Sequence, residues 1–395
     1  MEPGTFRAGD LVAVTLPPGP SWPGILADAR AAGAAVLPVD PRLPVAAARA
    51  LIARARPTLL LSEDGAARFD GAEGDAELGF LVATSGTSGE PRLVEHTRAS
   101  ADAAIAMCDA ALDLDATTRW LCCLPVAHVG GLLVALRHAT IGAHVEVHPR
   151  FDVEAFAASD ADAVSIVPTM LHRLVEAGAA LDRFRVILVG GAGLDPDLRR
   201  RAEDRGARIV QTYGMTETFG GVVHDGRMLD GVRVEADAGG RLRIASPTLM
   251  RAYRGDAEAT AAARDGEWFL TGDLGRVADG RVEVFGRADD AITTGGETVF
   301  PDVVEASLAA HPGVSEVAVA GVPDPEWGER VVAFVVPRDP AVPPTIDALR
   351  SLAGATLPPW AAPREVVLLG ALPRTASGKV RRAALRREHR PSPEG

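Results

Sequence analysis

The stretch DLVAVTLPPGPSWPGILADARAAGAAVLPVD, residues 10–40, decides the fold class. Two apolar runs, near residues 11–16 and 35–39, flank a segment of helical periodicity, with glycine and proline at the joints. Short apolar runs that alternate with helical segments are typical of parallel α/β structure. A second helical segment at 43–57 and an apolar run at 58–61 continue the pattern, so the sequence predicts an α/β fold.

Outward from this stretch, the chain predicts a large N-terminal domain of α/β layers, residues 1–287, and a small α+β C-terminal domain, residues 288–395. Short strands and turns at 241–287, without long helices, predict a β-rich subdomain in the large domain. The acidic, turn-rich residues 63–77 predict a loop. Further strands are expected at 80–86, 119–126, 143–148, 163–169, 183–191, 207–214, 316–322, 330–337 and 364–369, and helices at 169–179, 195–206, 303–314 and 345–357.

Composition excludes several classes of partner and cofactor. The chain has 395 residues and a net charge of −12, and its arginines are scattered without a basic stripe, so no nucleic-acid partner is expected. No apolar run approaches the ~20 residues of a membrane span, and the start lacks a signal-peptide pattern, so we expect a cytoplasmic protein without stable membrane insertion. Three cysteines without C-x-x-C spacing indicate neither disulfides nor zinc.

A loop rich in hydroxyls and glycines, TSGTSGEPR at residues 84–92, carries the first chemical signal. Its backbone amides can converge on phosphate oxygens without obstruction by Cβ atoms. It matches neither a Walker loop nor a hydrolase elbow. Taken alone, the motif is equally compatible with a flexible surface turn.

Further polar and glycine-rich motifs follow strands along the chain. QTYGMTET, residues 211–218, and VGGAG, residues 189–193, are expected at carboxyl ends of strands, where open α/β sheets bind ligands. Asp273 in GEWFLTGDLG is expected in a turn after a strand. Each motif alone is as compatible with a structural turn as with a site.

The stretch LPRTASGKVRR, residues 372–382, contains the single lysine of the chain, Lys379. The other 40 basic residues are arginine. Lysine offers a compact ammonium on a flexible stem, whereas arginine offers a planar fork. This exception indicates a position that requires more than positive charge.

The ordered set TSGTSGEPR, VGGAG, YGMTE, TGD, GRADDAITTGGETVFPDVVE and PRTASGK resembles the AMP-forming acyl- and aryl-CoA ligases of the adenylate-forming superfamily. The resemblance covers nearly the whole chain. It implies ATP, Mg²⁺ and coenzyme A as cofactors, a carboxylic acid as substrate, and a mobile C-terminal domain. A homodimer is left open.

The resemblance also assigns roles to individual residues. Lys379, Thr216 and Glu217 would be catalytic, with Glu217 also the Mg²⁺ ligand. Asp289 would be the hinge, and Gly295 and Gly296 would face the coenzyme A thiol. The family usually has lysine where this chain has Arg92, which keeps the charge. ATP binding is assigned to Thr84, Ser85, Gly86, Thr87, Ser88, Gly89, Arg92, Gly191, Ala192, Tyr213, Gly214, Met215, Asp273 and Arg287.

The pattern H-V-G-G…R at residues 128–137, with GMTETFGGVVHDGRMLDGV, resembles the o-succinylbenzoate-CoA ligases of menaquinone synthesis. Their substrate is an aromatic dicarboxylate, so Arg137 would pair with the second carboxylate; the alternative places Arg137 on the solvent side of a helix. His128 would gate the acyl pocket or cap that helix. Gly220 and Gly221 would leave room for the ring.

Other functions remain open at this level. The enzyme alternatives are a ligase for another aryl or medium-chain acid and an adenylating enzyme that loads a carrier protein. A nucleotide-binding pseudoenzyme is disfavoured because Glu217, Asp273, Arg287 and Lys379 are all intact. A dehydrogenase is disfavoured because no G-x-G-x-x-G follows the first strand.

Overall fold

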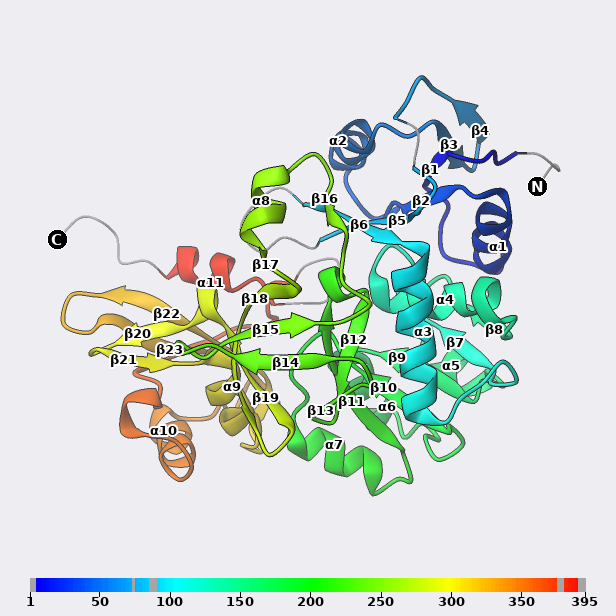
Figure 1. Ribbon diagram of the computed structural model, residues 1–395. Helices are drawn as coiled ribbons and strands as arrows, with labels where there is room; N and C mark the ends of the chain where they lie inside the picture. Colours follow the sequence, from blue (N-terminus) through cyan, green and yellow to red (C-terminus); the bar gives the residue numbers. More distant parts are fainter. Residues whose placement is uncertain (1–4, 73–74, 85–90, 375–379, 390–395) are drawn as a thin grey trace. The chain divides into compact units, whose positions relative to one another are not determined.

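The computed structural model describes residues 5–72, 75–84, 91–374 and 380–389 (Figure 1). The chain divides into two compact units. The first comprises Met1–Ala192, Leu198–Val234 and Ile244–Phe269, and the second comprises Gly193–Asp197, Glu235–Arg243 and Leu270–Gly395. The second unit therefore includes residues that precede position 288. The expected domain boundary at 287/288 describes where the C-terminal domain would rotate about a hinge, and it stays a prediction.

The opening βαβαβ segment is confirmed. Strand β1 (Leu11–Val14) pairs in parallel with β2 (Ala35–Pro38) and with β3 (Leu59–Ser62). Alternate residues of β1 pack against α1 (Trp22–Ala32) on one face and α2 (Val45–Ala55) on the other. Cover on both faces explains why β1 is apolar throughout instead of alternating with polar residues.

The first sheet has seven strands in the order β16-β6-β5-β2-β1-β3-β4. The expected loop 63–77 is wrong in part, because β4 (Gly65–Arg68) pairs antiparallel with β3. All residues of β4 are exposed at the sheet edge, so no apolar alternation marks it in the sequence. The remaining strands are β5 (Leu78–Ala83), β6 (Leu93–Thr97) and β16 (Ala252–Tyr253).

A second layer of the first unit contains the central parallel strands β8-β7-β9-β10-β11, extended by antiparallel β12 and β13. Buried residues of α1, α3, α4 and these strands share one core that includes Trp22, Trp120 and Phe219. The strands are β7 (Trp120–Cys122), β8 (Val145–Val147), β9 (Ala163–Ile166), β10 (Val186–Val189), β11 (Ile209–Met215), β12 (Gly220–His224) and β13 (Arg227–Met228).

Six helices accompany this layer and its surroundings in the described residues: α3 (Arg98–Leu112), α4 (Val129–Ile141), α5 (Val153–Ala158), α6 (Pro168–Glu176), α7 (Pro196–Glu203) and α8 (Ala257–Ala262). Short strands β15 (Arg241–Ala245) and β17 (Arg264–Asp265) lie within residues 241–287, where a β-rich subdomain was predicted, and β14 (Arg233–Ala236) lies just before that stretch. Among the residues that the structure places, no helix combines the length and apolarity that crossing a membrane requires.

The second unit contains β18 (Trp268–Ala278) from Leu270 onward, which forms a hairpin with β19 (Arg281–Arg287), and a sheet in the order β21-β20-β23-β22 with β24 beside β23. The long hairpin of β22 (Val314–Asp324) and β23 (Gly328–Pro337) forms its centre. The other elements are β20 (Ile292–Thr294), β21 (Glu297–Val299), α9 (Pro301–Ala309), α10 (Ile346–Gly354), β24 (Glu365–Leu368) and α11 (Arg382–Glu388). This α+β composition confirms the predicted fold class of the C-terminal part.

Candidate active site

The predicted phosphate loop joins β5 to β6, which pair antiparallel. The Thr84 N–H donates to the Arg92 carbonyl oxygen at 2.8 Å, and the Arg92 N–H donates to Thr84 Oγ1 at 3.0 Å. The strands therefore fix both ends of the loop. Predicted phosphate ligands Ser85, Gly86, Thr87, Ser88 and Gly89 lie outside the described residues.

The carboxylate of Glu217 lies beside the phosphate-loop stem. Tyr253 Oη donates a hydrogen bond to Glu217 Oε1 at 2.9 Å, and the Arg92 guanidinium lies over the Tyr253 ring, 5.0 Å from its centroid. Burial and the nearby Glu217 carboxylate raise the pKa of the Tyr253 phenol, which keeps it a donor at neutral pH. Tyr253 thus contacts both Arg92, which is predicted to bind phosphate, and Glu217, which is predicted to bind the metal.

His96 holds the backbone at Thr216. Its Nε2 lies 2.8 Å from the Thr216 carbonyl oxygen, and its ring packs 4.5 Å from that of Phe219. Burial lowers the pKa of His96 to about 4, so the ring is neutral and Nε2 carries the proton for this bond. The Thr216 backbone is therefore positioned by a buried imidazole.

The motif QTYGMTET lies at the carboxyl end of its strand, as expected, although β11 runs one residue beyond the predicted 207–214, through Met215 to the 3₁₀ turn Thr216–Thr218. The reason is the antiparallel partner β12, which pairs with Tyr213–Met215. These residues are thus held by a strand ladder. The sheet edge begins at Thr216.

The glycines at this hairpin serve close packing. A Cβ at Gly214 would lie 1.9 Å from the Gly220 carbonyl oxygen, and one at Gly221 would lie 1.9 Å from Thr212 Oγ1. Gly220 has φ +106°, and a Cβ there would meet Leu133 Cδ1 at 2.4 Å. Close packing therefore accounts for glycine at both positions, and the room that Gly220 and Gly221 were expected to leave for a substrate ring stays a prediction.

The motif VGGAG lies at the carboxyl end of β10, as predicted. Gly191 has φ +83°, a conformation that favours glycine, and a Cβ at Gly190 would meet Thr212 Cγ2 at 2.7 Å. Ala192 follows directly. The placement agrees with a strand-end ligand site; the adenine contact of Gly191 and Ala192 stays a prediction.

In the second unit, Asp273 and Arg287 face each other across the β18–β19 hairpin. Asp273 lies within a strand, so its expected turn is wrong: β18 continues to Ala278 because β19 pairs along it. Arg287 Nη1 lies 3.5 Å from Asp273 Oδ1, and a Cβ at Gly272 would lie 2.6 Å from Arg287 Nη2. Glycine at 272 therefore lets the guanidinium lie across the strand.

The predicted hinge, Asp289, follows this hairpin in a 3₁₀ turn at Ala288–Asp290. Its side chain is 79% exposed, with Oδ2 3.9 Å from Arg287 Nη2. Gly295 and Gly296 form the two-residue turn between β20 and β21, both with positive φ, which a type I′ hairpin turn requires. The turn geometry accounts for both glycines, and the hinge and thiol-facing roles stay predictions.

Lys379 lies outside the described residues, but the chain on both sides of it is fixed. Arg374 forms an isolated antiparallel bridge with Val380, and the Arg381 N–H donates to the Pro373 carbonyl oxygen at 2.8 Å. Arg382, which begins α11, binds both Glu305 oxygens at 2.8 Å and also contacts Asp290 and Asp302. These contacts tie α11 to α9 within the second unit.

His128 and Arg137 were the predicted acyl-pocket residues. His128 occupies the N-cap position of α4 without a side-chain capping bond, and its Nε2 lies 3.8 Å from Asp40 Oδ2. Arg137 is only 2% exposed, so its placement on a solvent face is wrong.

The charge of Arg137 is already paired inside the protein. Its Nη2 and Nε donate to Asp109 Oδ1 at 2.7 and 3.1 Å, Nη1 donates to the Leu133 carbonyl oxygen, and the guanidinium stacks 3.9 Å from the centroid of the Trp120 ring. A substrate carboxylate would have to displace Asp109. We therefore assign Arg137 to the core and not to the substrate.

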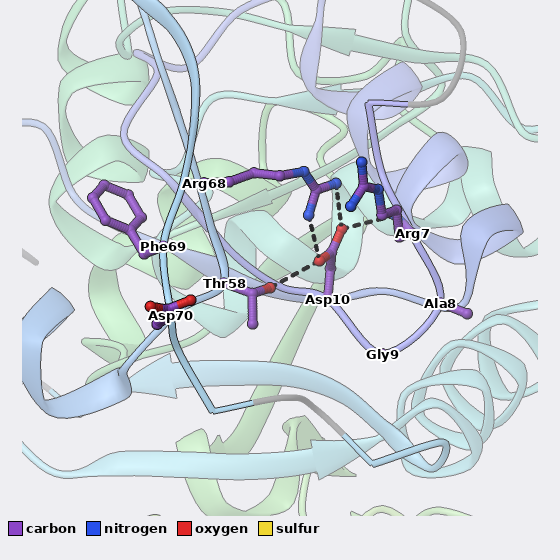
Figure 2. Close-up of a pocket in the computed structure, with 8 residues that line it drawn as sticks. All are labelled: Arg7, Ala8, Gly9, Asp10, Thr58, Arg68, Phe69 and Asp70. Carbon is purple, nitrogen blue, oxygen red and sulfur yellow. Dashed lines mark hydrogen bonds and ion pairs between the residues drawn. The ribbon is translucent and has the colours of Figure 1, made fainter.

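A surface pocket of about 460 Å³ is lined by residues 7–10, 58 and 68–70, none of which is a predicted site residue (Figure 2). Figure 2 shows Arg7 and Arg68 on either side of Asp10. The Asp10 carboxylate accepts from Arg68 at 2.9 and 3.1 Å and from Thr58 Oγ1 at 2.9 Å. These bonds tie together the ends of β1, β3 and β4.

Sequence patterns alone missed Tyr253, His96 and Asp109. Tyr253 lies in MRAYRGD, residues 250–256, which carries no glycine-rich or acidic motif. One signal was available, because the chain has only two tyrosines and the other, Tyr213, lies in a recognised motif.

Comparison with known proteins supports the predicted resemblance. The model of the AMP-binding enzyme family matches residues 73–243, and that of the AMP-binding enzyme C-terminal domain matches residues 303–379. A probable 2-succinylbenzoate–CoA ligase of Mycobacterium tuberculosis is 40% identical over 327 residues, 79% of this chain and 84% of that protein.

One further sequence relative and one solved structure are also similar to this chain. A long-chain-fatty-acid–CoA ligase of M. tuberculosis is 33% identical over 346 residues, 80% of this chain and 68% of that protein. The solved o-succinylbenzoate CoA synthetase of Bacillus subtilis, in complex with its acyl-adenylate intermediate, has a TM-score of 0.85 and 25% identity, and the match covers 96% of this chain and 88% of that one. The chain therefore belongs to the AMP-binding enzyme family, the AMP-forming acyl-CoA ligases.

Proposed function

We propose that this ligase joins 2-succinylbenzoate, also called o-succinylbenzoate, to coenzyme A, a step of menaquinone biosynthesis. The observation that supports the nucleotide half is that Tyr253 contacts both Arg92, the proposed phosphate-binding cation, and Glu217, the proposed metal ligand. The acid is supported by the names of the relative at 40% identity and of the solved B. subtilis structure.

In the first half-reaction a carboxylate oxygen of the acid attacks the α-phosphorus of ATP, and pyrophosphate leaves. The approach of two anions makes the barrier largely electrostatic. Lys379 would place its ammonium between the carboxylate and the α-phosphate, with Thr216 on the same phosphate. Arg92 would contact the phosphate tail, while Asp273 and Arg287 would hold the ribose hydroxyls and Tyr213 would frame adenine.

Glu217 fits a hard divalent cation. Its Oε1 is occupied by Tyr253, whereas within the described part of the chain no hydrogen bond reaches Oε2. Oxygen ligands from carboxylates suit Mg²⁺. Bound there, Mg²⁺ would neutralise phosphate charge.

In the second half-reaction the thiolate of coenzyme A attacks the adenylate carbonyl, and AMP leaves. The turn of Gly295 and Gly296 would then face the thiol after rotation about Asp289. Because Arg137 is paired with Asp109, the second carboxylate of 2-succinylbenzoate must be bound by other groups.

Pyrophosphate release measured with 2-succinylbenzoate, benzoate and a medium-chain fatty acid tests the proposal, each acid with and without coenzyme A. We expect the largest kcat/KM with 2-succinylbenzoate and release of AMP only when coenzyme A is present. Preference for either monocarboxylate would refute the proposed acid while leaving the ligase chemistry intact.

A second candidate is a long-chain acyl substrate, which the 33% identical fatty-acid ligase favours. Adding palmitate to the same panel separates the two. A kcat/KM for palmitate above that for 2-succinylbenzoate would establish this alternative. Light scattering of the purified protein separately tests the homodimer left open by the sequence.

A further inference from the structure

Tyr253 is held in place from three directions. Strand β16 pairs it with Val94 in β6, directly after the phosphate-loop stem. The side chain is buried among Val94, Met250 and Phe269, and only 5% of the residue is exposed. The Tyr253 N–H donates to Thr260 Oγ1 at 2.9 Å in α8. A ring with so little freedom offers its hydroxyl in one direction.

Ion pairs also hold the segment around Tyr253 to strand β6. The buried carboxylate of Glu95 accepts from Arg251 Nη2 at 2.7 Å and from Arg254 Nη1 at 3.0 Å. Met250 directly precedes Arg251, and its N–H donates to the Glu217 carbonyl oxygen at 2.7 Å. The segment that carries Tyr253 is thus hydrogen-bonded to the backbone of Glu217, which fixes the position of the ring relative to that backbone.

Glu217 is consequently fixed at both ends. Its carbonyl oxygen accepts from Met250 and its Oε1 accepts from Tyr253 at 2.9 Å. A hydrogen bond to one carboxylate oxygen sets the rotamer and leaves the other oxygen to meet a cation. Partners of this kind behind a metal ligand typically contribute 10–100-fold to metal affinity or activity, in order of magnitude.

We propose that Tyr253 is a positioning residue that holds the Mg²⁺-binding carboxylate of Glu217 close to the Arg92 guanidinium. The inference rests on the proposed function, in which Glu217 is the metal ligand. Loss of the hydroxyl frees the carboxylate to rotate, whereas the ring that supports Arg92 remains. The Tyr253→Phe variant should therefore fold normally but bind Mg²⁺ more weakly.

The test compares wild type and Tyr253→Phe in two measurements. Isothermal titration of ATP at graded Mg²⁺ concentrations reports metal-dependent nucleotide binding without any acid. Pyrophosphate release at the same Mg²⁺ concentrations reports the first half-reaction. We expect the Mg²⁺ concentration at half-maximum to rise roughly 10-fold or more in both, and thioester formation from supplied acyl-adenylate to change less than about twofold, because that step involves no phosphate transfer.

A double variant completes the design. In a Glu217→Gln background, Tyr253→Phe should have no further effect on Mg²⁺ dependence, because the carboxylate that it positions is gone. Unchanged Mg²⁺ dependence in Tyr253→Phe, or equal loss in both half-reactions, would overturn the inference. Failure of the wild type to use 2-succinylbenzoate refutes only the proposed acid, since the titration with ATP does not depend on it.

Discussion

Replacing Arg137 by methionine tests whether the residue belongs to the core or to the substrate. Methionine approximates the length of the arginine stem but carries no charge. The change strands the Asp109 carboxylate, which is 6% exposed and whose Oδ1 accepts both the 2.7 Å and the 3.1 Å bonds from the guanidinium. It also removes the bond to the Leu133 carbonyl and the stacking on Trp120.

The magnitude follows from the burial of the pair. Removing one partner of a buried ion pair costs about 3–5 kcal/mol, because the remaining charge has no solvent. A domain of about 150–250 residues loses ~2–4 °C of thermal midpoint per kcal/mol. The expected drop for Arg137→Met is therefore roughly 6–20 °C.

Differential scanning calorimetry gives the midpoint, and a matched double variant, Arg137→Met with Asp109→Leu, isolates the pair. Removing both charges should recover at least ~1 kcal/mol relative to the single variant. At 25 °C the folded single variant should keep the wild-type KM for its acid. An unchanged midpoint together with a KM raised for 2-succinylbenzoate, but not for benzoate, would refute the core assignment.

Three further outcomes follow from the site and its surroundings. Lys379→Arg should slow pyrophosphate release about 100-fold or more, because a planar fork cannot occupy the place of a compact ammonium, whereas Arg92→Lys should keep most of it. Gly214→Ala should destabilise the protein by about 1–3 kcal/mol in urea unfolding, since its Cβ would lie 1.9 Å from the Gly220 carbonyl oxygen. Stability should fall as pH drops from 6.5 towards 4, because the unfolded chain binds a proton that buried His96, with its pKa lowered to about 4, refuses; urea midpoints across this window measure the loss.

Each of these outcomes has its contradiction. Equal slowing by Lys379→Arg and Arg92→Lys would show that position 379 needs only charge. Gly19→Ala serves as the control for crowding, since no atom lies within 4 Å of the added Cβ, and equal losses in both glycine variants would reject the steric argument. A pH profile that His96→Gln leaves unchanged would remove His96 as its cause.

The sequence could predict the features that repeat locally. Residues 10–40 carry their α/β signal in neighbouring apolar runs, and β1 and β2 formed as expected. Strand β4 carried no such signal, because an exposed edge strand needs no apolar face. Asp273 was misplaced for a related reason, since pairing with β19, rather than local turn residues, extends β18.

Pairings between distant residues could not be predicted from one sequence. Arg137 and Asp109 are 28 positions apart, and Tyr253 and Glu217 are 36 apart, on separate elements whose packing determines their partners. A charged residue in an apolar helix is compatible with solvent, substrate or an internal ion. Only the packing of α3 against α4 selects the third.

The scarcity of tyrosine gives this enzyme a built-in spectroscopic window. Both tyrosines lie beside predicted nucleotide contacts, Tyr213 in β11 and Tyr253 in β16. Protein grown with fluorotyrosine would therefore show two fluorine resonances, assignable with a single Tyr253→Phe sample. Addition of Mg²⁺, ATP and acid in turn could then be followed at each ring separately, in the intact chain.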